Sequence, residues 1–372
     1  MMFGSLRSCR GIGEFGLEHG SSQFMKAVFV RYFVLIWAIW LIPSGGCQES
    51  QQTSGVAMPT VGRETEGIVR YLLQERTDGL ESIADWDNEY GPGLCLTTKH
   101  YEIYTTLLDP LMLRQTPAFM EAAYQGYVAQ LSKPVELTIP LTVYLFADRP
   151  QWEAFTRQFA GAQAEMYCKI RAGAYCHNGA CVVYNIGRKR TFAALGHEGW
   201  HQFNMRIFRY RLPSWLDEGV AMLFEVSEQS NGTFTFDPAR NNYRLDGLRT
   251  TLRQRRAMAL GELLKSNPGE VLASNNADAL LTFYSQAYAL VRFLREADQG
   301  RRLERFQRLL GDGLTGQWPL GEYAGRMAAD RNLPRIVEWN RVVGTQLFRY
   351  YIDDDIERIE KEYLAFCARI TN

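Results

Sequence analysis

The residues best suited to chemistry are two histidines, His197 and His201, with Glu198 between them in the motif HEGWH. On an α-helix, residues four apart lie one above the other on the same face, so both imidazoles can bind one metal ion. Glu198 lies one step around the helix, where its carboxylate can accept a proton from metal-bound water without being a ligand. The motif therefore predicts a single zinc ion with a general base beside it.

A catalytic zinc ion requires a third protein ligand, and Glu218 is the candidate. It lies in the segment WLDEGVA, residues 215–221, early in the next predicted helix. A turn between the two helices can return its carboxylate to the metal. With two histidines and one glutamate bound, the fourth position holds water, which is typical of catalytic rather than structural zinc.

The pattern resembles the gluzincin metallopeptidases, in which HExxH is followed by a glutamate on the next helix. The segment WLDEGVA is similar to the WLNEGFA segment of aminopeptidase-N-type enzymes, with Asp217 in place of asparagine and a spacing two residues shorter. No GxMEN stretch of the exopeptidase type occurs upstream, so aminopeptidase specificity is not implied. A wider resemblance, over residues 100–294, is to uncharacterised zincin-like domains of bacterial secreted proteins. These share a His-Tyr strand, a VYLF strand, HExxH, WLxEG and a later YxQAY helix.

The resemblance implies a zincin-like fold, a peptide or protein substrate and one further residue at the site. In related gluzincins, a tyrosine near the start of the later helix donates a hydrogen bond to the oxyanion of the tetrahedral intermediate. Tyr284 stands at this position, in the segment FYSQAY. Tyr288, one turn later, is the alternative, and both can instead be core aromatic residues.

The order of the predicted elements indicates an α+β fold, in which a small mixed sheet and the active-site helix precede an all-helical C-terminal half. The strand at 180–186 is expected to edge the cleft, and Pro140 indicates an edge or a bulge in the strand before it. Thr191 is the expected N-cap of the motif helix. Strands are predicted at 100–106, 135–146 and 180–186, and helices at 67–80, 117–131, 148–159, 192–208, 215–224, 279–297, 301–310 and 334–364.

Composition excludes several classes of protein. Of the 372 residues, 46% are hydrophobic and 22% are charged, so neither disorder nor a fibrous fold is expected. The chain has 41 basic and 41 acidic residues, and this balance gives no overall field towards nucleic acid. Nucleic acid is therefore not an expected partner, and specificity must come from a local site.

The N-terminal region is typical of an exported protein. Two cations in residues 25–31 precede an apolar run, 32–42, which is shorter than the ~20 residues of a membrane-spanning helix. The sequence PSGGC follows, and the segment resembles a bacterial lipoprotein signal with Cys47 as the lipidated residue, although Ser44 replaces the usual leucine. Simple cleavage and an uncleaved anchor are the alternatives. We expect an extracytoplasmic protein of the bacterial cell envelope, tethered to the membrane or else secreted or periplasmic.

Three regions follow from this interpretation. Residues 1–47 comprise an upstream extension and the signal, with Met1 and Met25 as alternative starts. Residues 48–66, rich in Gln, Ser, Thr and Gly, are expected to be a flexible linker. Residues 67–372 form the expected metallopeptidase domain, with an α/β part to about 208 and a helical part over 209–372.

The cysteines after Cys47 are odd in number, so disulfides in an oxidising compartment would leave at least one unpaired. The cluster that contains Cys168 lacks the paired CxxC spacing of structural zinc, and a hairpin-closing disulfide is expected instead. His100 and His177 are expected to be structural, and Gly199 to allow close packing. The five cysteines are Cys95, Cys168, Cys176, Cys181 and Cys367.

The predicted activity is that of a zinc-dependent hydrolase acting on peptide bonds. Two other interpretations stay open: a catalytically inactive zincin-fold lipoprotein that acts as an envelope binding or scaffold protein, and a zinc hydrolase acting on a non-peptide amide. Glu198 is not needed to bind zinc, so its presence favours chemistry.

Overall fold

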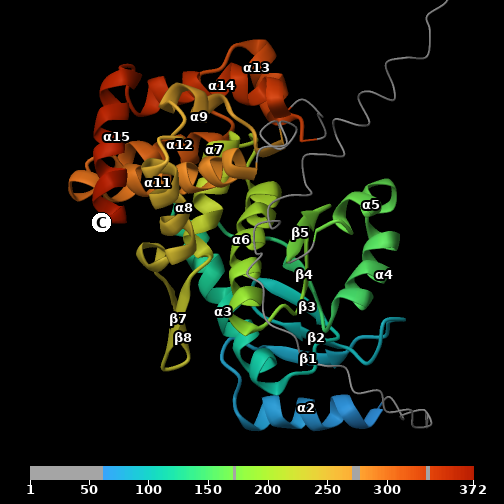
Figure 1. The fold of residues 1–372 in the computed structure, drawn as a ribbon. Coiled ribbons are helices and arrows are strands. Elements are labelled where there is room, and N and C mark those ends of the chain that lie inside the picture. Colours follow the sequence, from blue (N-terminus) through green and yellow to red (C-terminus); the bar gives the residue numbers. More distant parts are fainter. Residues whose placement is uncertain (1–61, 171–172, 270–276, 332–335) are drawn as a thin grey trace, which may run out of the picture.

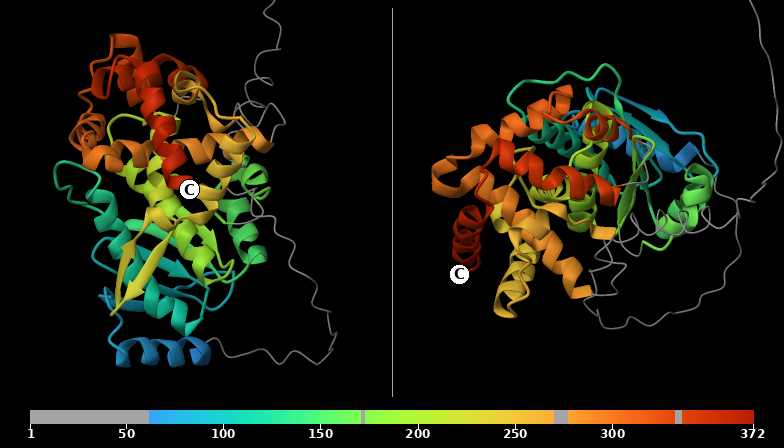
Figure 2. Two further views of the ribbon diagram at one scale, coloured as in Figure 1. Left: turned by 60° about the vertical axis from the view of Figure 1, so that its left-hand side comes forward. Right: turned by 90° about the horizontal axis from the view of Figure 1, so that it is seen from above.

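The structure is a computed structural model that describes residues 62–170, 173–269, 277–331 and 336–372. A six-stranded mixed sheet lies towards one end of the molecule and most of the helices lie towards the other (Figures 1 and 2). This arrangement agrees with the mixed α and β composition predicted from the sequence. The signal segment, Cys47 and most of the expected linker lie outside the described residues. Within the described ranges, no helix has the length and apolar character needed to cross a membrane.

The sheet combines antiparallel and parallel pairs. In spatial order the strands are β1 (Ser82–Asp85), β2 (Leu94–Thr97), β3 (Tyr101–Thr105), β4 (Leu141–Phe146), β6 (Ala180–Tyr184) and β5 (Ala174–His177). The β3–β4 and β4–β6 pairs are parallel and the other pairs are antiparallel. Strands β3 and β6 confirm two of the sequence predictions.

Two expectations about strands are wrong. Strand β4 begins only after Pro140, because a proline donates no hydrogen bond and stays outside the ladder. The strand itself is central, between β3 and β6. Strand β5 pairs with the outer side of β6, so the strand predicted at 180–186 is not at the edge of the sheet. The β5–β6 hairpin turns at Asn178 and Gly179, which both have positive φ angles, as expected for a two-residue hairpin turn.

Local capping explains where the helices of the α/β part begin. Asp109 accepts a hydrogen bond from the Met112 amide at 2.8 Å, so α3 (Pro110–Val128) begins before the predicted residue 117 and contains Pro117 internally. Asp148 caps α4 (Arg149–Phe159), whose bounds agree with the helix predicted at 148–159. Helix α2 (Gly62–Gln74) begins within the expected linker. The short helices here are η1 (Gly161–Gln163) and α5 (Ala164–Tyr167).

Helix α6 (Arg188–Ile207) carries the HEGWH motif and packs against α3, β5 and β6 (Figure 1). Its N-cap is Gly187, whose φ angle is +91°, and the expected N-cap, Thr191, lies in the first turn. The Thr191 hydroxyl accepts a hydrogen bond from the Ile186 amide and donates one to the Gly187 carbonyl. It therefore ties the end of β6 to the start of α6 from within the helix.

The C-terminal half is mainly helical, but it is not all-helical as predicted. Strands β7 (Ser227–Ser230) and β8 (Thr233–Phe236) form a hairpin whose turn residues, Asn231 and Gly232, have positive φ angles. The predicted helix 334–364 is divided into α14 and α15. The helical elements are α7 (Ser214–Ala221), η2 (Met222–Phe224), η3 (Pro238–Arg240), α8 (Asn242–Arg253), α9 (Leu260–Lys265), α11 (Ala277–Gly300), α12 (Leu303–Thr315), α13 (Glu322–Ala329), α14 (Ile336–Tyr351) and α15 (Ile356–Thr371).

Candidate metal centre

Three predicted ligands meet between α6 and α7. The Nε2 atoms of His197 and His201 are 3.2 Å apart, and Glu218 Oε2 lies 3.4 Å from the first and 3.6 Å from the second. Ligands arranged tetrahedrally around zinc, with bonds of 2.0–2.1 Å, are about 3.3 Å from one another. The three side chains thus form a group that could hold one metal ion, with spacings that match zinc.

The hydrogen bonds of the outer ring nitrogens determine which atoms can bind a metal. His197 Nδ1 lies 3.0 Å from Glu225 Oε1, and His201 Nδ1 lies 3.1 Å from Asp217 Oδ1. Because a carboxylate accepts, each Nδ1 carries the proton and each Nε2 presents a lone pair. Glu218 Oε2 is buried and has no hydrogen-bond partner among the described residues. With both imidazoles neutral, three acceptors face one another, and a cation would relieve their repulsion.

Electrostatics in the site favour positive charge. Burial lowers the pKa of both histidines, but the surrounding carboxylates outweigh burial and the net pKa shift of His197 and of His201 is upward. Burial raises the pKa of Glu218, yet His201 and then His197 lower it to about 2. The carboxylate stays ionised in a buried position, as a metal ligand must.

Asp217 holds His201 in place. Its Oδ1 accepts hydrogen bonds from His201 Nδ1, from Trp200 Nε1 at 3.0 Å and from Asn204 Nδ2 at 2.9 Å. Such a partner fixes the orientation of a metal-bound histidine. In the sequence, Asp217 was notable only as a departure from the aminopeptidase-like segment. The sequence signal that could have revealed this role is the position of Asp217, a carboxylate directly before the predicted ligand Glu218.

Glu225, immediately after η2, holds His197 in the same way. Its carboxylate also accepts from Asn241 Nδ2 at 2.8 Å and from Arg244, through Nε at 2.9 Å and Nη2 at 2.5 Å. Burial raises the pKa of Glu225, but Arg244 and then His197 lower it to about 2. Sequence reasoning missed Glu225, Asn241 and Arg244, because no motif connects them to HExxH.

Glycines allow neighbouring elements to approach the motif. A Cβ atom on Gly199 would lie 2.4 Å from the hydroxyl of Tyr127 in α3, and one on Gly196 would lie 2.3 Å from the Phe224 carbonyl. The Tyr127 hydroxyl donates a hydrogen bond of 2.7 Å to the Gly196 carbonyl. This geometry confirms the expectation that Gly199 is there for close packing.

Glu198 is buried beside the ligand group, with 1% of its surface exposed. Its charge acts on groups from two sides of the site: burial first, and then Glu198, raise the pKa of the Cys176 thiol in β5 and of the Cys181 thiol in β6. Glu198 also contributes to the raised pKa of Tyr284 in α11. The carboxylate therefore lies within electrostatic range of both the β5–β6 edge and α11.

The two candidate tyrosines differ in their surroundings. The Tyr284 hydroxyl is buried and has no hydrogen-bond partner among the described residues, whereas Tyr288 donates to the Pro238 carbonyl and accepts from Arg292. Burial, followed by the Glu218 carboxylate, raises the Tyr284 pKa well above its usual value. The Tyr284 hydroxyl therefore stays protonated within electrostatic range of Glu218, while the Tyr288 hydroxyl is already hydrogen-bonded elsewhere.

A family described as "Protein of unknown function (DUF1570)" matches residues 191–312. The match extends from the first turn of α6 into α12 and assigns no activity. A search of curated proteins finds no match to the chain. The matched range contains the ligands and the residues around them: His197, Glu198, His201, Asp217, Glu218, Glu225, Asn241, Arg244 and Tyr284.

The expected hairpin-closing disulfide is not formed. All five cysteines predicted to lie in the folded body have free thiols. Cys176 and Cys181 are opposite each other in the β5–β6 ladder, and both are buried. They pack in the interior as small apolar side chains, as free cysteines commonly do. His177 contacts the Tyr167 hydroxyl at 3.2 Å, and His100 pairs with Glu121 at 2.6 Å, as expected for structural histidines.

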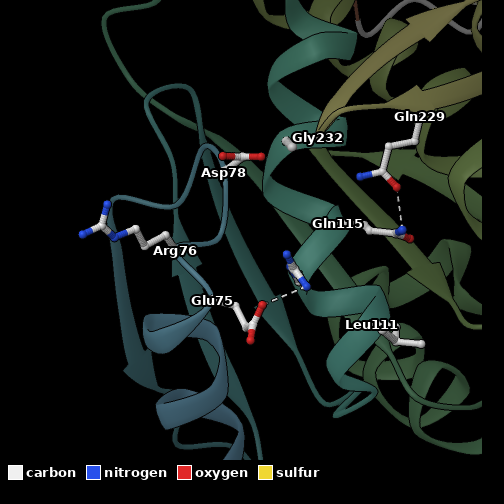
Figure 3. A pocket seen from close by; sticks show the side chains of 9 residues that line it. Glu75, Arg76, Asp78, Leu111, Gln115, Gln229 and Gly232 are labelled. Atoms are coloured by element: carbon white, nitrogen blue, oxygen red, sulfur yellow. Dashed lines mark hydrogen bonds and ion pairs between the residues drawn. The ribbon is translucent and has the colours of Figure 1, made fainter.

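A separate polar pocket of about 380 Å³ lies between the segment that follows α2, helix α3 and the β7–β8 hairpin (Figure 3). Its side chains pair with one another: Arg114 with Glu75 at 3.1 Å, and Gln115 with Gln229 at 2.6 Å. None of the candidate ligands lines it. The pocket is therefore distinct from the metal centre.

Proposed function

We propose that the protein is a zinc-dependent hydrolase of zincin-like fold that cleaves peptide bonds. The observation that supports it best is the convergence of His197 Nε2, His201 Nε2 and Glu218 Oε2, each histidine being oriented by a buried or half-buried carboxylate. Two imidazoles and one carboxylate are the ligand set of catalytic zinc, with one position left for water or substrate.

The residues around the ligands supply the remaining functions of a hydrolase. When bound, zinc acts as a Lewis acid and lowers the pKa of water. Glu198 accepts the proton of the attacking water and returns it to the leaving amine. Tyr284, whose hydroxyl is otherwise unpartnered among the described residues, donates a hydrogen bond to the oxyanion that develops on the scissile carbonyl.

Strand β5 is the element suited to align an extended peptide. It is the outermost strand on its side of the sheet and contacts α6, which carries Glu198. An edge strand offers backbone donors and acceptors to a peptide regardless of its side chains. This assignment replaces the strand at 180–186, which lies inside the sheet.

We also propose, from the signal segment alone, that the folded body is held outside the cytoplasm by a lipid on Cys47. Lipoproteins carry several acyl chains, which anchor a protein more firmly than the marginal binding of one chain. Labelling with a radioactive fatty acid tests this, with Cys47→Ser as the control. Equal labelling of both proteins would exclude a lipid on Cys47.

The experiment that tests the function combines metal analysis with turnover. Purified protein is expected to contain one equivalent of zinc and to cleave an unfolded protein such as reduced casein. Glu198→Gln should retain zinc and lose cleavage. His197→Asn should lose zinc, whereas His100→Asn is a matched control, because His100 is also a buried histidine paired with a carboxylate.

Each part of the proposal has its own contrary result. Zinc absent from well-folded protein would exclude the metal site. Stoichiometric zinc without Glu198-dependent cleavage of casein would exclude the peptidase and leave a binding or scaffold protein or a hydrolase of another amide. A panel of non-peptide amides then separates these two.

A further inference from the structure

Arg244 is a buried charge next to the candidate metal centre. It lies in the first turn of α8, capped by Asn241, and 4% of its surface is exposed. Its guanidinium meets Glu225 through two parallel hydrogen bonds, Nε to Oε2 at 2.9 Å and Nη2 to Oε1 at 2.5 Å. This bidentate geometry fixes the orientation of the carboxylate as well as its charge.

The same carboxylate contacts a metal ligand. Glu225 Oε1, which accepts from Arg244, also lies 3.0 Å from His197 Nδ1. A buried carboxylate needs a cation to remain charged and correctly oriented. The contacts thus form a continuous chain from Arg244 through Glu225 to the imidazole of His197.

The face of the guanidinium has a second contact. Arg244 Cζ lies 5.3 Å from the centroid of the Tyr284 ring and 5.2 Å from that of Tyr243. The Tyr284 hydroxyl has no hydrogen-bond partner among the described residues, so packing around its ring determines where it points. Arg244 is one of the groups that provide this packing, and it does so through an attractive cation–π contact.

We propose that Arg244 is a positioning residue that couples two parts of the site, the orientation of His197 and the placement of the Tyr284 hydroxyl. The inference rests on the proposed zinc-dependent function, since it assigns Arg244 a role towards the ligand and the oxyanion donor. A residue with only a structural role would stabilise the fold without affecting the orientation of His197 or the placement of the Tyr284 hydroxyl.

Arg292 provides a matched control for a purely structural role. Its side chain is 6% exposed, it pairs with Glu296 at 2.7 Å, and its Cζ lies 5.5 Å from the ring centroid of Tyr288. It therefore has the same kinds of contact as Arg244, a carboxylate and a tyrosine ring. Its carboxylate, Glu296, is not among the contacts of the candidate ligands.

The test compares Arg244→Lys with Arg292→Lys in the full folded protein. Lysine keeps the positive charge but cannot form the bidentate pair or stack a planar group, so the comparison isolates geometry from charge. The readouts are zinc affinity by chelator competition, the visible spectrum of the Co²⁺-substituted protein, thermal unfolding, and kcat and KM on a peptide at saturating zinc.

We expect Arg244→Lys to weaken zinc binding about 10–100-fold, to change the Co²⁺ spectrum and to lower kcat with little change in KM. Arg292→Lys is expected to lower the unfolding temperature similarly, with zinc affinity and kcat within about twofold of wild type. Wild-type zinc affinity, Co²⁺ spectrum and kcat in folded Arg244→Lys would overturn the inference.

A double-mutant cycle tests the connection to Tyr284. At saturating zinc, Arg244→Lys should lower kcat in the wild-type background but much less in Tyr284→Phe, because the hydroxyl that it positions is already absent. Equal losses in both backgrounds would overturn the coupling. If Arg244→Lys does not fold, Glu225→Gln tests the connection to His197, with weakened zinc binding as the expected result and unchanged binding as the contrary one.

These outcomes are distinguishable from failure of the proposed function. Wild-type protein that binds no zinc refutes the metal site itself. Wild-type protein that binds zinc but cleaves nothing refutes the peptidase, and chelator competition and the Co²⁺ spectrum of Arg244→Lys still decide whether Arg244 positions His197.

Discussion

Replacing Gly199 with alanine should destabilise the protein, although alanine is the better helix former. The new Cβ would lie 2.4 Å from the Tyr127 hydroxyl, about 1 Å inside the 3.4 Å limit of ordinary contact. Tyr127 is fully buried and would have to give up its hydrogen bond to the Gly196 carbonyl. Overpacking lowers the free energy of unfolding by about 1–3 kcal/mol, and a lost buried hydrogen bond lowers it by about 1–3 kcal/mol. The higher helix propensity of alanine raises it by about 1 kcal/mol. We expect the free energy of unfolding to fall by about 3 kcal/mol.

Urea denaturation followed by circular dichroism measures this loss, and two variants make it specific. Gly261→Ala, in a helix where nothing lies within 4 Å of the added Cβ, should leave stability unchanged or raise it by up to about 1 kcal/mol. Tyr127→Phe removes the clashing hydroxyl and leaves the next ring carbon at 3.3 Å. Gly199→Ala combined with Tyr127→Phe should therefore be little worse than Tyr127→Phe alone. If the two losses simply add, the hydroxyl is not the obstacle and the reasoning fails.

Three further predictions concern the ligands and the thiols. Asp217→Ala should weaken zinc binding about 10–100-fold, because His201 loses the acceptor that orients it; unchanged affinity in chelator competition would contradict this role. Removing the metal with a chelator should lower the unfolding free energy, and free zinc at 100 times its dissociation constant should restore about 2.7 kcal/mol; identical melting curves would argue against a specific site. Cys176 and Cys181 should react with a maleimide only after unfolding, since both thiols are buried and burial raises their pKa. A disulfide-linked peptide containing both residues in mass spectrometry would contradict the free-thiol assignment.

The part of the site that follows from helix periodicity was predictable. His197 and His201 are four residues apart, so any helix through them places both rings on one face. Glu218 required a turn between two helices, and the proline at 213 and the short loop made that turn foreseeable. The same locality explains why the bounds of α4 agree closely with the helix predicted at 148–159.

The part that depends on long-range packing was not predictable from local patterns. Glu225 follows η2, which packs against α6, and Arg244 reaches it from α8. Nothing in the spacing of the two residues encodes that contact. Likewise, Pro140 was interpreted as the mark of an edge strand or a bulge, but it precedes β4, and its local sequence could not reveal that β4 pairs on both sides. The Asn231–Gly232 turn carried the usual hairpin signal, yet its flanking strands are only four residues long and have little periodicity.

The charges buried around the ligands leave a net negative charge that a bound cation would offset. Glu198, Glu218 and Glu225 are buried carboxylates, and Arg244 is the buried guanidinium that pairs with one of them. With both histidines neutral, these four groups carry a formal charge of −2. Uncompensated charge is costly away from water, and the carboxylates around His197 and His201 shift the pKa of both histidines upward. A zinc ion would balance the charge without protonating the nitrogens that bind it. The same charge balance explains why lysine, rather than a neutral residue, is the informative substitution at Arg244. Removing the positive charge would strengthen cation binding electrostatically, but it would also weaken binding because Glu225 and His197 lose their orientation. With lysine the charge is kept, so only the second effect is measured.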